Sequence, residues 1–188
     1  ITAVPDAENL PPTTTPDSYT VAEDMLLSDP ANSVLDNDSD PEGAELTARL
    51  VSRPSNGLIR FQTDGTFLYS PHFNFNGTDT FTYVANDGNV DSSITTATIT
   101  VTPVNDAPFV ANPEVSTDED TPKEGQIDSI DVEDDPYEFA LETPASNGTA
   151  IINPDGTFSY TPDDNFYGQD IVVFRATDDR DASRVGTL

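Results

Sequence analysis

Residues 64–71 read DGTFLYSP, and 91 positions later residues 155–162 read DGTFSYTP. The same shift places the SNG of 55–57 on the SNG of 146–148, and the match between these segments has no gap. Self-similarity at a fixed period indicates an internal duplication. The chain therefore contains two copies of one repeat of roughly ninety residues.

The local pattern within each repeat is that of β-strands. TATITV at 96–101 and DTFTYVA at 79–85 alternate apolar or aromatic residues with polar ones, as strands with one buried face require. Turns rich in Asn, Asp and Gly separate such runs. About seven runs per repeat predict an all-β fold of two tandem immunoglobulin-like β-sandwiches. The inward-facing candidates of the first repeat are Leu46, Leu50, Ile59, Phe67, Tyr69, Phe81, Tyr83, Ala97, Ile99 and Val101.

The register of the duplication sets the domain boundaries. We expect residues 1–12 to be the end of a preceding repeat with its linker, 13–104 the first sandwich and 105–188 the second. The counterpart of TATITV has barely begun at RVGTL, so the last strand of the second repeat is expected to be short or missing. We therefore expect the chain to be part of a longer array.

The excess of acidic residues favours a bound cation. The formal net charge is −28, from 35 acidic against 7 basic residues, and only 35% of the residues are hydrophobic. Repulsion of this size opposes a compact chain unless the acids are neutralised. So few basic residues argue against nucleic acid and anionic membranes as partners, and no apolar run approaches a membrane span. With no cysteine, disulfides and cysteine-based zinc sites are excluded.

The predicted junction between the repeats reads VTPVNDAP at 101–108. Prolines on both sides of Asn105 and Asp106 stiffen a linker, whereas Gly and Ser would loosen it. If the strands alternate in direction, Glu23 and Asp24 lie at the bottom of the first repeat, with Asp178 at the top of the second. The acidic run DVEDD, which contains Asp131, Glu133 and Asp135, joins Asp178 there. Converging carboxylates repel one another, and calcium relieves this repulsion with six to eight oxygen ligands.

These segments also carry a family resemblance. FTYVANDG and TATITVTPVNDAP resemble the strand, Asp-containing turn and Asn-Asp-x-Pro linker of cadherin repeats. VLDNDSDPEG and the duplicated DGTF segments resemble the bacterial cadherin-like, immunoglobulin-like tandem repeats of large secreted adhesins of the RTX type. The resemblance implies extended repeats that bind calcium. The implied ligands at the junction are Glu23 or Asp24, Asn105, Asp106, Asp131, Glu133 and Asp178, to which the acidic run adds Asp135.

A matching set of acids lies at the top of the first repeat. It comprises Asp38, Asp40, Glu42 and Asp87, with Asp6, Glu8 or Asn9 as linker partners. This site is expected to differ from the second one, because Ala44 stands where the second repeat has Asp135. The linker also has Pro103 where the family often has an aspartate, which removes one ligand.

The acid clusters and the single histidine also allow readings other than a calcium site. Acid clusters also occur simply as solvated surface. An EF-hand loop beginning at Asp36 fails, because its sixth position is Pro41 and its twelfth is Thr47. His72, the only histidine, has no counterpart in the second repeat and is expected on the surface. Paired carboxylates suit glycosidases, but no deep cleft is expected, so we predict that the chain is not an enzyme.

The function predicted from the sequence is a calcium-stiffened stalk. We expect extender repeats of a bacterial adhesin, secreted or displayed on the cell surface, with calcium and neighbouring repeats of the same chain as partners. The alternative is a binding module for polysaccharide or for another copy of the adhesin. It would use Phe73 and Tyr167 as platforms for sugar rings, while Phe75 and Phe166 are expected to close the core.

Overall fold

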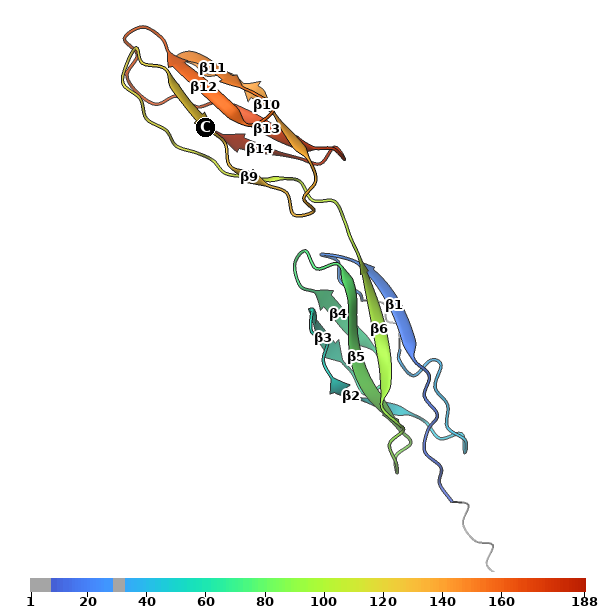
Figure 1. Ribbon diagram of the computed structural model, residues 1–188. Coiled ribbons are helices and arrows are strands. Elements are labelled where there is room, and N and C mark those ends of the chain that lie inside the picture. Colours follow the sequence, from blue (N-terminus) through green and yellow to red (C-terminus); the bar gives the residue numbers. More distant parts are fainter. Residues whose placement is uncertain (1–7, 29–32) are drawn as a thin grey trace, which may run out of the picture. The chain divides into compact units, whose positions relative to one another are not determined.

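The computed structural model describes residues 8–28 and 33–188 of the chain. The chain divides into two compact units, residues 1–104 and residues 105–188, and every regular element in the described ranges is a strand (Figure 1). The prediction of an all-β fold is confirmed. Residues 1–7, including the candidate linker ligand Asp6, lie outside the described residues, and so does most of the segment expected to belong to a preceding repeat.

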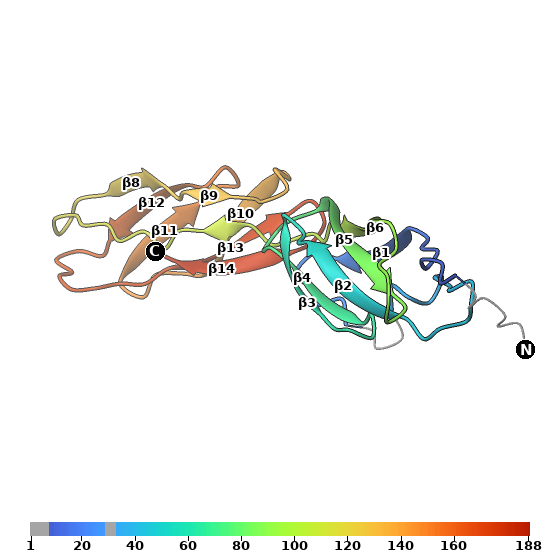
Figure 2. The same cartoon turned by 90° about the horizontal axis from the view of Figure 1, so that it is seen from below.

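The first unit is a two-layered β-sandwich. One sheet has the order β1-β6-β5-β2 and the other is the hairpin β3-β4, as Figures 1 and 2 show. Leu27 adds an isolated bridge to Tyr69 beside this hairpin. The strand bounds are β1 Asp17–Ala22, β2 Thr47–Ser52, β3 Gly57–Phe61, β4 Phe67–Pro71, β5 Gly77–Asn86 and β6 Thr95–Thr102.

Alternation along the strands fills the core of the first unit. Eight of the ten inward-facing candidates are buried there, namely Ile59, Phe67, Tyr69, Phe81, Tyr83, Ala97, Ile99 and Val101. Of the other two, Leu50 is half-buried but packs against this core as predicted, whereas Leu46 is half-buried and lies before β2 begins. Ala48 is the fully buried residue of β2, alternation holds from Thr47 to Leu50, and a register shift in the pairing with β5 follows Leu50.

The second unit has the same architecture in shorter pieces. Its sheets have the orders β10-β13-β14, β11-β12-β8 and β7-β9. Phe139, Phe158 and Phe174 are its largest buried core side chains. The strand bounds are β7 Phe109–Val110, β8 Lys123–Gln126, β9 Ser129–Ile130, β10 Tyr137–Thr143, β11 Gly148–Ile152, β12 Thr157–Pro162, β13 Val173–Asp178 and β14 Ser183–Thr187.

An aspartate fixes the same turn in each unit, and it is buried in the first unit and half-buried in the second. In the first unit Asp79 accepts hydrogen bonds from the N–H groups of Ser55 and Asn56, at 3.0 and 2.8 Å, and from the hydroxyl of Tyr69 at 2.9 Å. Asp170 receives the equivalent bonds in the second unit. Carboxylates satisfied in this way are structural, and they tie the SNG turn to β5 in the first unit and to the segment before β13 in the second.

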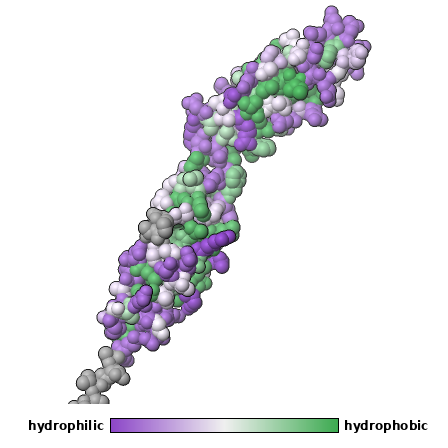
Figure 3. Space-filling view, turned by 180° about the vertical axis from the view of Figure 1, so that it is seen from behind, coloured by the Kyte–Doolittle hydropathy of each residue, from purple (hydrophilic) through white to green (hydrophobic). Residues whose placement is uncertain are grey.

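The surface of both units is mostly hydrophilic on the face shown in Figure 3, with smaller apolar patches between the polar side chains. The described residues include no helix long and apolar enough to cross a membrane.

Candidate metal centres

Three acids after β9 form the densest cluster of possible metal ligands in the described chain. One carboxylate oxygen from each of Asp131, Glu133 and Asp135 lies within 4.8 Å of the other two. Asp131, only 4% exposed, organises the loop, because its Oδ1 accepts the N–H groups of Glu133 and Asp135, both at 3.1 Å. Alternate residues of the loop therefore turn their carboxylates toward the same place.

The remaining oxygens of this cluster are buried and lack hydrogen-bond donors. Oδ2 of Asp131 and Oε1 of Glu133 have no hydrogen-bond partner in the described structure. Oδ2 of Asp135 has only an ion pair, with Nη1 of Arg180 at 3.2 Å. Buried carboxylate oxygens without donors are rare and costly, and an ion is one of the few ways to satisfy them.

The linker residues of the second unit are bound to the same cluster. Asn105 donates its amide N–H to Oδ2 of Asp178 at 2.8 Å, and the backbone N–H of Asp106 donates to Oε2 of Glu133 at 3.2 Å. Oδ1 of Asp178 in turn accepts the N–H groups of Arg180 and Ala182, at 2.8 and 2.9 Å. The start of the linker is thus held against both acidic loops of its own unit.

Electrostatics differ between the two sides of this site. Burial raises the pKa of Glu133, and the nearby charges of Asp106 and Asp131 raise it further. Burial also acts to raise the pKa of Asp178, but the hydrogen bonds from Asn105, Arg180 and Ala182 outweigh it and lower that pKa. Hydrogen bonds therefore stabilise the negative charge of Asp178, whereas the charge on the Glu133 side of the site lacks such compensation.

The residues fit calcium. Two oxygens on opposite sides of one calcium ion are about 4.6–5.2 Å apart, since each lies roughly 2.3–2.6 Å from the ion. The 4.8 Å spread of the three carboxylate oxygens meets that condition. An all-oxygen donor set without histidine or cysteine suits a hard cation such as calcium better than zinc.

The first unit contains a counterpart with fewer carboxylates. Asn9 donates to Oδ2 of Asp87 at 2.7 Å, and the N–H of Leu10 donates to Oε2 of Glu42 at 3.2 Å. Oδ1 of Asp40 accepts the N–H groups of Glu42 and Ala44, at 3.0 and 2.9 Å. Within residues 8–28 and 33–188, Oδ2 of Asp40 is buried without a hydrogen-bond partner, whereas the side chain of Ala44 supplies no oxygen in place of that of Asp135.

Asp38 lies among different partners from those of Asp40. It accepts the N–H of Thr15 at 2.8 Å and the hydroxyl of Tyr83 at 3.0 Å. Burial raises the pKa of Asp38, and these two hydrogen bonds act against that rise. In this structure the carboxylate of Asp38 therefore binds Thr15 and Tyr83 of the sandwich and not the loop around Asp40.

Glu23 and Asp24 are neighbours with different surroundings. Glu23, 1% exposed, accepts the N–H of Val104 on Oε1 at 2.6 Å, and its Oε2 has no hydrogen-bond partner in the described structure. Asp24 has a positive φ of 60° and accepts the N–H of Asn74 on Oδ1 at 3.1 Å. Glu23 therefore has a buried oxygen without a hydrogen-bond donor, whereas the carboxylate of Asp24 is exposed to solvent.

Sequence reasoning missed Arg180 as a member of the second site. Its guanidinium pairs with Asp135 and also donates to Oδ1 of Asn105 at 3.4 Å. The duplication does show a difference at this position, because the first repeat has the neutral residue Asn89 where the second has Arg180.

The loop aromatics divide as expected between core and surface. Phe73 is 83% exposed and Tyr167 is 88% exposed, whereas Phe75 and Phe166 are half-buried. Phe75 packs against the core of the first unit.

Comparison with known sequences identifies the class of protein that this fold and these acidic loops define. The bacterial cadherin-like domain family matches residues 9–103, and the bacterial Ig domain family matches residues 105–188. The chain belongs to the bacterial cadherin-like family, with a bacterial Ig domain in tandem. The resemblance to bacterial cadherin-like and immunoglobulin-like tandem repeats is confirmed, and these domain types are typical of adhesion-related extracellular or surface proteins.

Individual relatives are distant. The integrin beta-like protein E of Dictyostelium discoideum is 34% identical over 110 residues, which are 49% of this chain and 6% of that protein. Among solved structures, human protocadherin-24 EC1-2 is 12% identical with a TM-score of 0.61, covering 96% of this chain and 94% of that one. The human desmocollin-1 ectodomain is 17% identical with a TM-score of 0.55, covering 97% and 36%. These structures show a shared fold.

Proposed function

We propose that the two units are calcium-binding extender repeats of a bacterial surface adhesin. The observation that carries the proposal is the cluster of Asp131, Glu133 and Asp135, with carboxylate oxygens that are buried and lack donors. A solvated acidic surface would leave these oxygens in contact with water. Their burial in a chain of net charge −28 favours a bound cation.

Each residue has a part in the proposed site. Asp131, Glu133 and Asp135 would hold the ion, while Asp178 would fix Asn105 and with it the start of the linker. When bound, calcium supplies positive charge that offsets the repulsion among these acids. Because these oxygens converge only in the folded loop, binding would stabilise the folded unit, and the bond from the N–H of Asp106 to Glu133 would extend this order to the linker.

Stiffening of the junction extends this proposal to the first unit. Glu23 is hydrogen-bonded to Val104, the residue directly before Asn105 in the chain, and has one oxygen without a donor. We include Glu23 among the candidate calcium ligands of the first unit, where it would order the residues just before the linker, and we leave Asp24 out because it is exposed and its Oδ1 accepts the N–H of Asn74. The prolines of VTPVNDAP would keep the ordered junction extended.

Small-angle scattering tests this function directly. In saturating calcium the maximum dimension should be sharply defined, and after chelation the scattering should become that of two units on a flexible linker. Asp131→Asn should show the flexible behaviour in calcium, while Glu138→Gln, which changes an exposed acid outside the cluster, should match the parent protein. Identical profiles with calcium and with chelator would refute the stalk.

The exposed aromatics favour a second candidate, a carbohydrate-binding or self-binding module. Phe73 and Tyr167 expose flat apolar surface on loops, which suits stacking on sugar rings. Saturable binding to an insoluble polysaccharide that is lost in Phe73→Ala or Tyr167→Ala would favour this function over a passive spacer. We propose no catalytic function for either unit.

A further inference from the structure

The arginines of the first unit gather around one hollow. Residues 8–104 contain three of the seven lysine and arginine residues of the chain, namely Arg49, Arg53 and Arg60. All three line a hollow of about 470 Å³, which we call the β2–β3 hollow and which is lined by residues 48–50, 53 and 59–63. Positive charge is therefore concentrated at one place in a strongly acidic chain.

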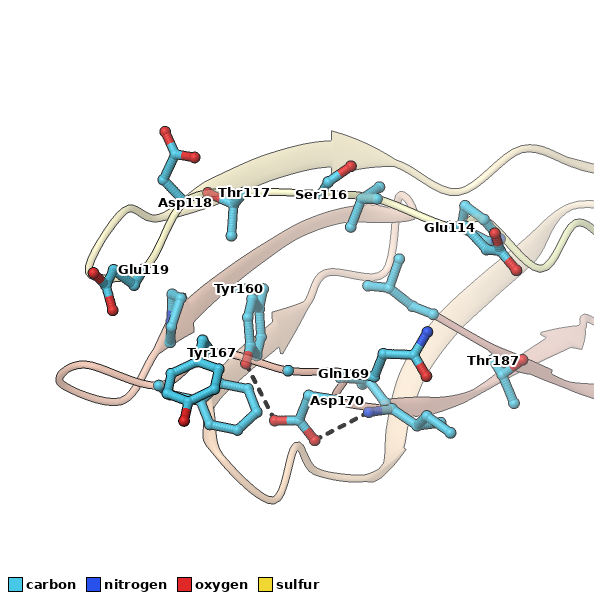
Figure 4. Close-up of a pocket in the computed structure, with 18 of the residues that line it drawn as sticks. Glu114, Ser116, Thr117, Asp118, Glu119, Tyr160, Tyr167, Gln169, Asp170 and Thr187 are labelled. Carbon is cyan, nitrogen blue, oxygen red and sulfur yellow. Dashed lines mark hydrogen bonds between the residues drawn. The ribbon is translucent and has the colours of Figure 1, made fainter.

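A larger hollow in the second unit has the opposite charge. Among the described residues, its lining includes four acids and no basic residue. Figure 4 shows Glu114, Asp118 and Glu119 along one side of it and Asp170 along the other. Of these two hollows, the β2–β3 hollow is therefore the one that attracts an anionic ligand.

The β2–β3 hollow lies between the facing edges of the two sheets. β2 ends the order β1-β6-β5-β2, and β3 is the outer strand of its hairpin with β4, as Figures 1 and 2 show. At one end the N–H of Ala48 donates to the carbonyl oxygen of Thr63 at 2.8 Å. At the other end Nη1 of Arg53 donates to the carbonyl oxygen of Ile59 at 3.1 Å. These bonds hold the two edges together at both ends and leave the hollow between them.

The lining of the β2–β3 hollow combines apolar surface with hydrogen-bonding groups. Leu50 and Phe61 line it, and both are half-buried against the core of the first unit. Gln62 and Thr63 add exposed polar side chains. Sites for small ligands are typically hollows of about 300–1,000 Å³ that pair apolar surface with a few polar groups. The β2–β3 hollow has this size and this composition.

The three guanidinium groups are engaged to different degrees, and all three arginines are exposed. The bond to Ile59 fixes Arg53 but uses only one of its five N–H donors. Arg49 pairs with Asp91 at 2.9 Å, and because both side chains are exposed, this pair is weak enough to open for a ligand. Within residues 8–28 and 33–188, Arg60 has no hydrogen bond or ion pair. The hollow therefore has donors available for an anion.

We propose that the β2–β3 hollow binds a carboxylate-bearing sugar at the end of a glycan. A guanidinium presents two parallel N–H groups that match the two oxygens of a carboxylate. The apolar face of the sugar ring would lie on Leu50 and Phe61, with its hydroxyls hydrogen-bonded to Gln62 and Thr63. An extended polyanion would run past the hollow and meet a chain of net charge −28, which disfavours it against a single acidic sugar. This site involves neither the calcium ligands nor the exposed loop aromatics.

Backbone amide NMR of the 188-residue protein in calcium tests this ligand. Methyl glucuronide should shift the signals of residues 48–53 and 59–63 in a saturable way, with a roughly millimolar dissociation constant. Methyl glucoside, which has a neutral hydroxymethyl group in place of the carboxylate, should bind at least about fivefold more weakly. Neutral residues replace the three arginines in the second repeat, so the signals of β10 and β11 should stay unchanged. Equal affinity for the two methyl glycosides would overturn the proposal.

Three substitutions locate the binding. Arg60→Gln removes a guanidinium that makes no bond in the described structure, so it should weaken glucuronide binding about fivefold at an unchanged melting temperature. Arg184→Gln removes the same charge from an exposed arginine of β14, outside the hollow, and should bind as the parent does. Phe73→Ala should also bind as the parent does, which separates this site from the loop aromatics. Parent-like affinity in Arg60→Gln would overturn the assignment to this hollow.

Two further probes test other anionic partners at the same hollow. Polygalacturonate represents an extended polyanion, and the blocked peptide DVEDD, the sequence of residues 131–135, represents an acidic loop of a second copy. If polygalacturonate shifts the signals of the hollow and methyl glucuronide does not, the ligand is a polyanion and the proposal is wrong. If the peptide alone shifts them, the partner is an acidic protein segment, and the proposal is wrong as well.

Discussion

Replacing Asp131 by asparagine should remove the calcium response of the second unit with little change in its metal-free stability. Oδ1 of Asp131 accepts two backbone N–H groups, and an asparagine oxygen can accept the same bonds. The substitution removes Oδ2, which has no hydrogen-bond partner, together with one of the negative charges of the cluster. The variant therefore tests Asp131 as a metal ligand while it keeps the hydrogen bonds by which Asp131 supports the loop.

The size of the effect follows from binding linkage. For an extracellular calcium module with a dissociation constant of roughly 10⁻⁴ to 10⁻³ M, about 10 mM calcium stabilises the folded state by ~1.4 to 2.7 kcal/mol. For a domain of this size, such an increase raises the melting temperature by roughly 6 to 20 °C. In Asp131→Asn the increase should fall to a few degrees or less, because the remaining ligands bind calcium weakly.

Differential scanning calorimetry with chelator and with calcium measures this difference for the parent, Asp131→Asn and the control Glu138→Gln. Glu138 is exposed and lies outside the cluster, so its variant should keep the full calcium shift. An undiminished shift in Asp131→Asn would refute the reasoning that places the ion at this cluster.

Three further predictions concern other residues. Arg180→Ala should tighten calcium binding about two- to fivefold in isothermal titration, because Arg180 competes for Asp135 with an exposed ion pair; weaker binding would mean that Arg180 organises the site. Burial raises the pKa of Asp17 to about 6, so its ionisation costs stability that is regained as the pH falls below 6. Asp17→Asn should therefore be more stable than the parent by about 1 to 3 kcal/mol at pH 7, as measured by urea unfolding, with the difference vanishing near pH 4; a difference independent of pH would contradict this. Asp79→Ala should destabilise the first unit by about 3 kcal/mol or more, since it strands the N–H groups of Ser55 and Asn56, whereas Asp64→Ala at an exposed turn should cost far less in the same assay.

The sequence predicted the sandwich core well where strands alternate regularly. β4 and β6 alternate without interruption, and their apolar residues are buried as expected. Leu46 departs from the prediction because alternation gives no sign of where β2 begins, and it also gives no sign of the register shift after Leu50.

The acidic loops were predictable as sets but not residue by residue. The duplication aligned Asp40 with Asp131, and these two do share the same backbone bonds. It could not show that Asp38 turns to Tyr83, or that Asp24 binds Asn74 while Glu23 binds Val104. Two adjacent acids cannot be told apart in a sequence. The backbone angles that turn their side chains in different directions depend on partners that lie far away along the chain. Asp79 and Asp170 were visible only as aligned positions, although each anchors a turn.

Anomalous diffraction from crystals grown in calcium tests the metal centre most directly. A peak is expected within coordination distance of Asp131, Glu133 and Asp135, with Arg180 displaced from Asp135. Density for water alone among these carboxylates in calcium-replete crystals, with Arg180 still paired to Asp135, would contradict the proposed centre.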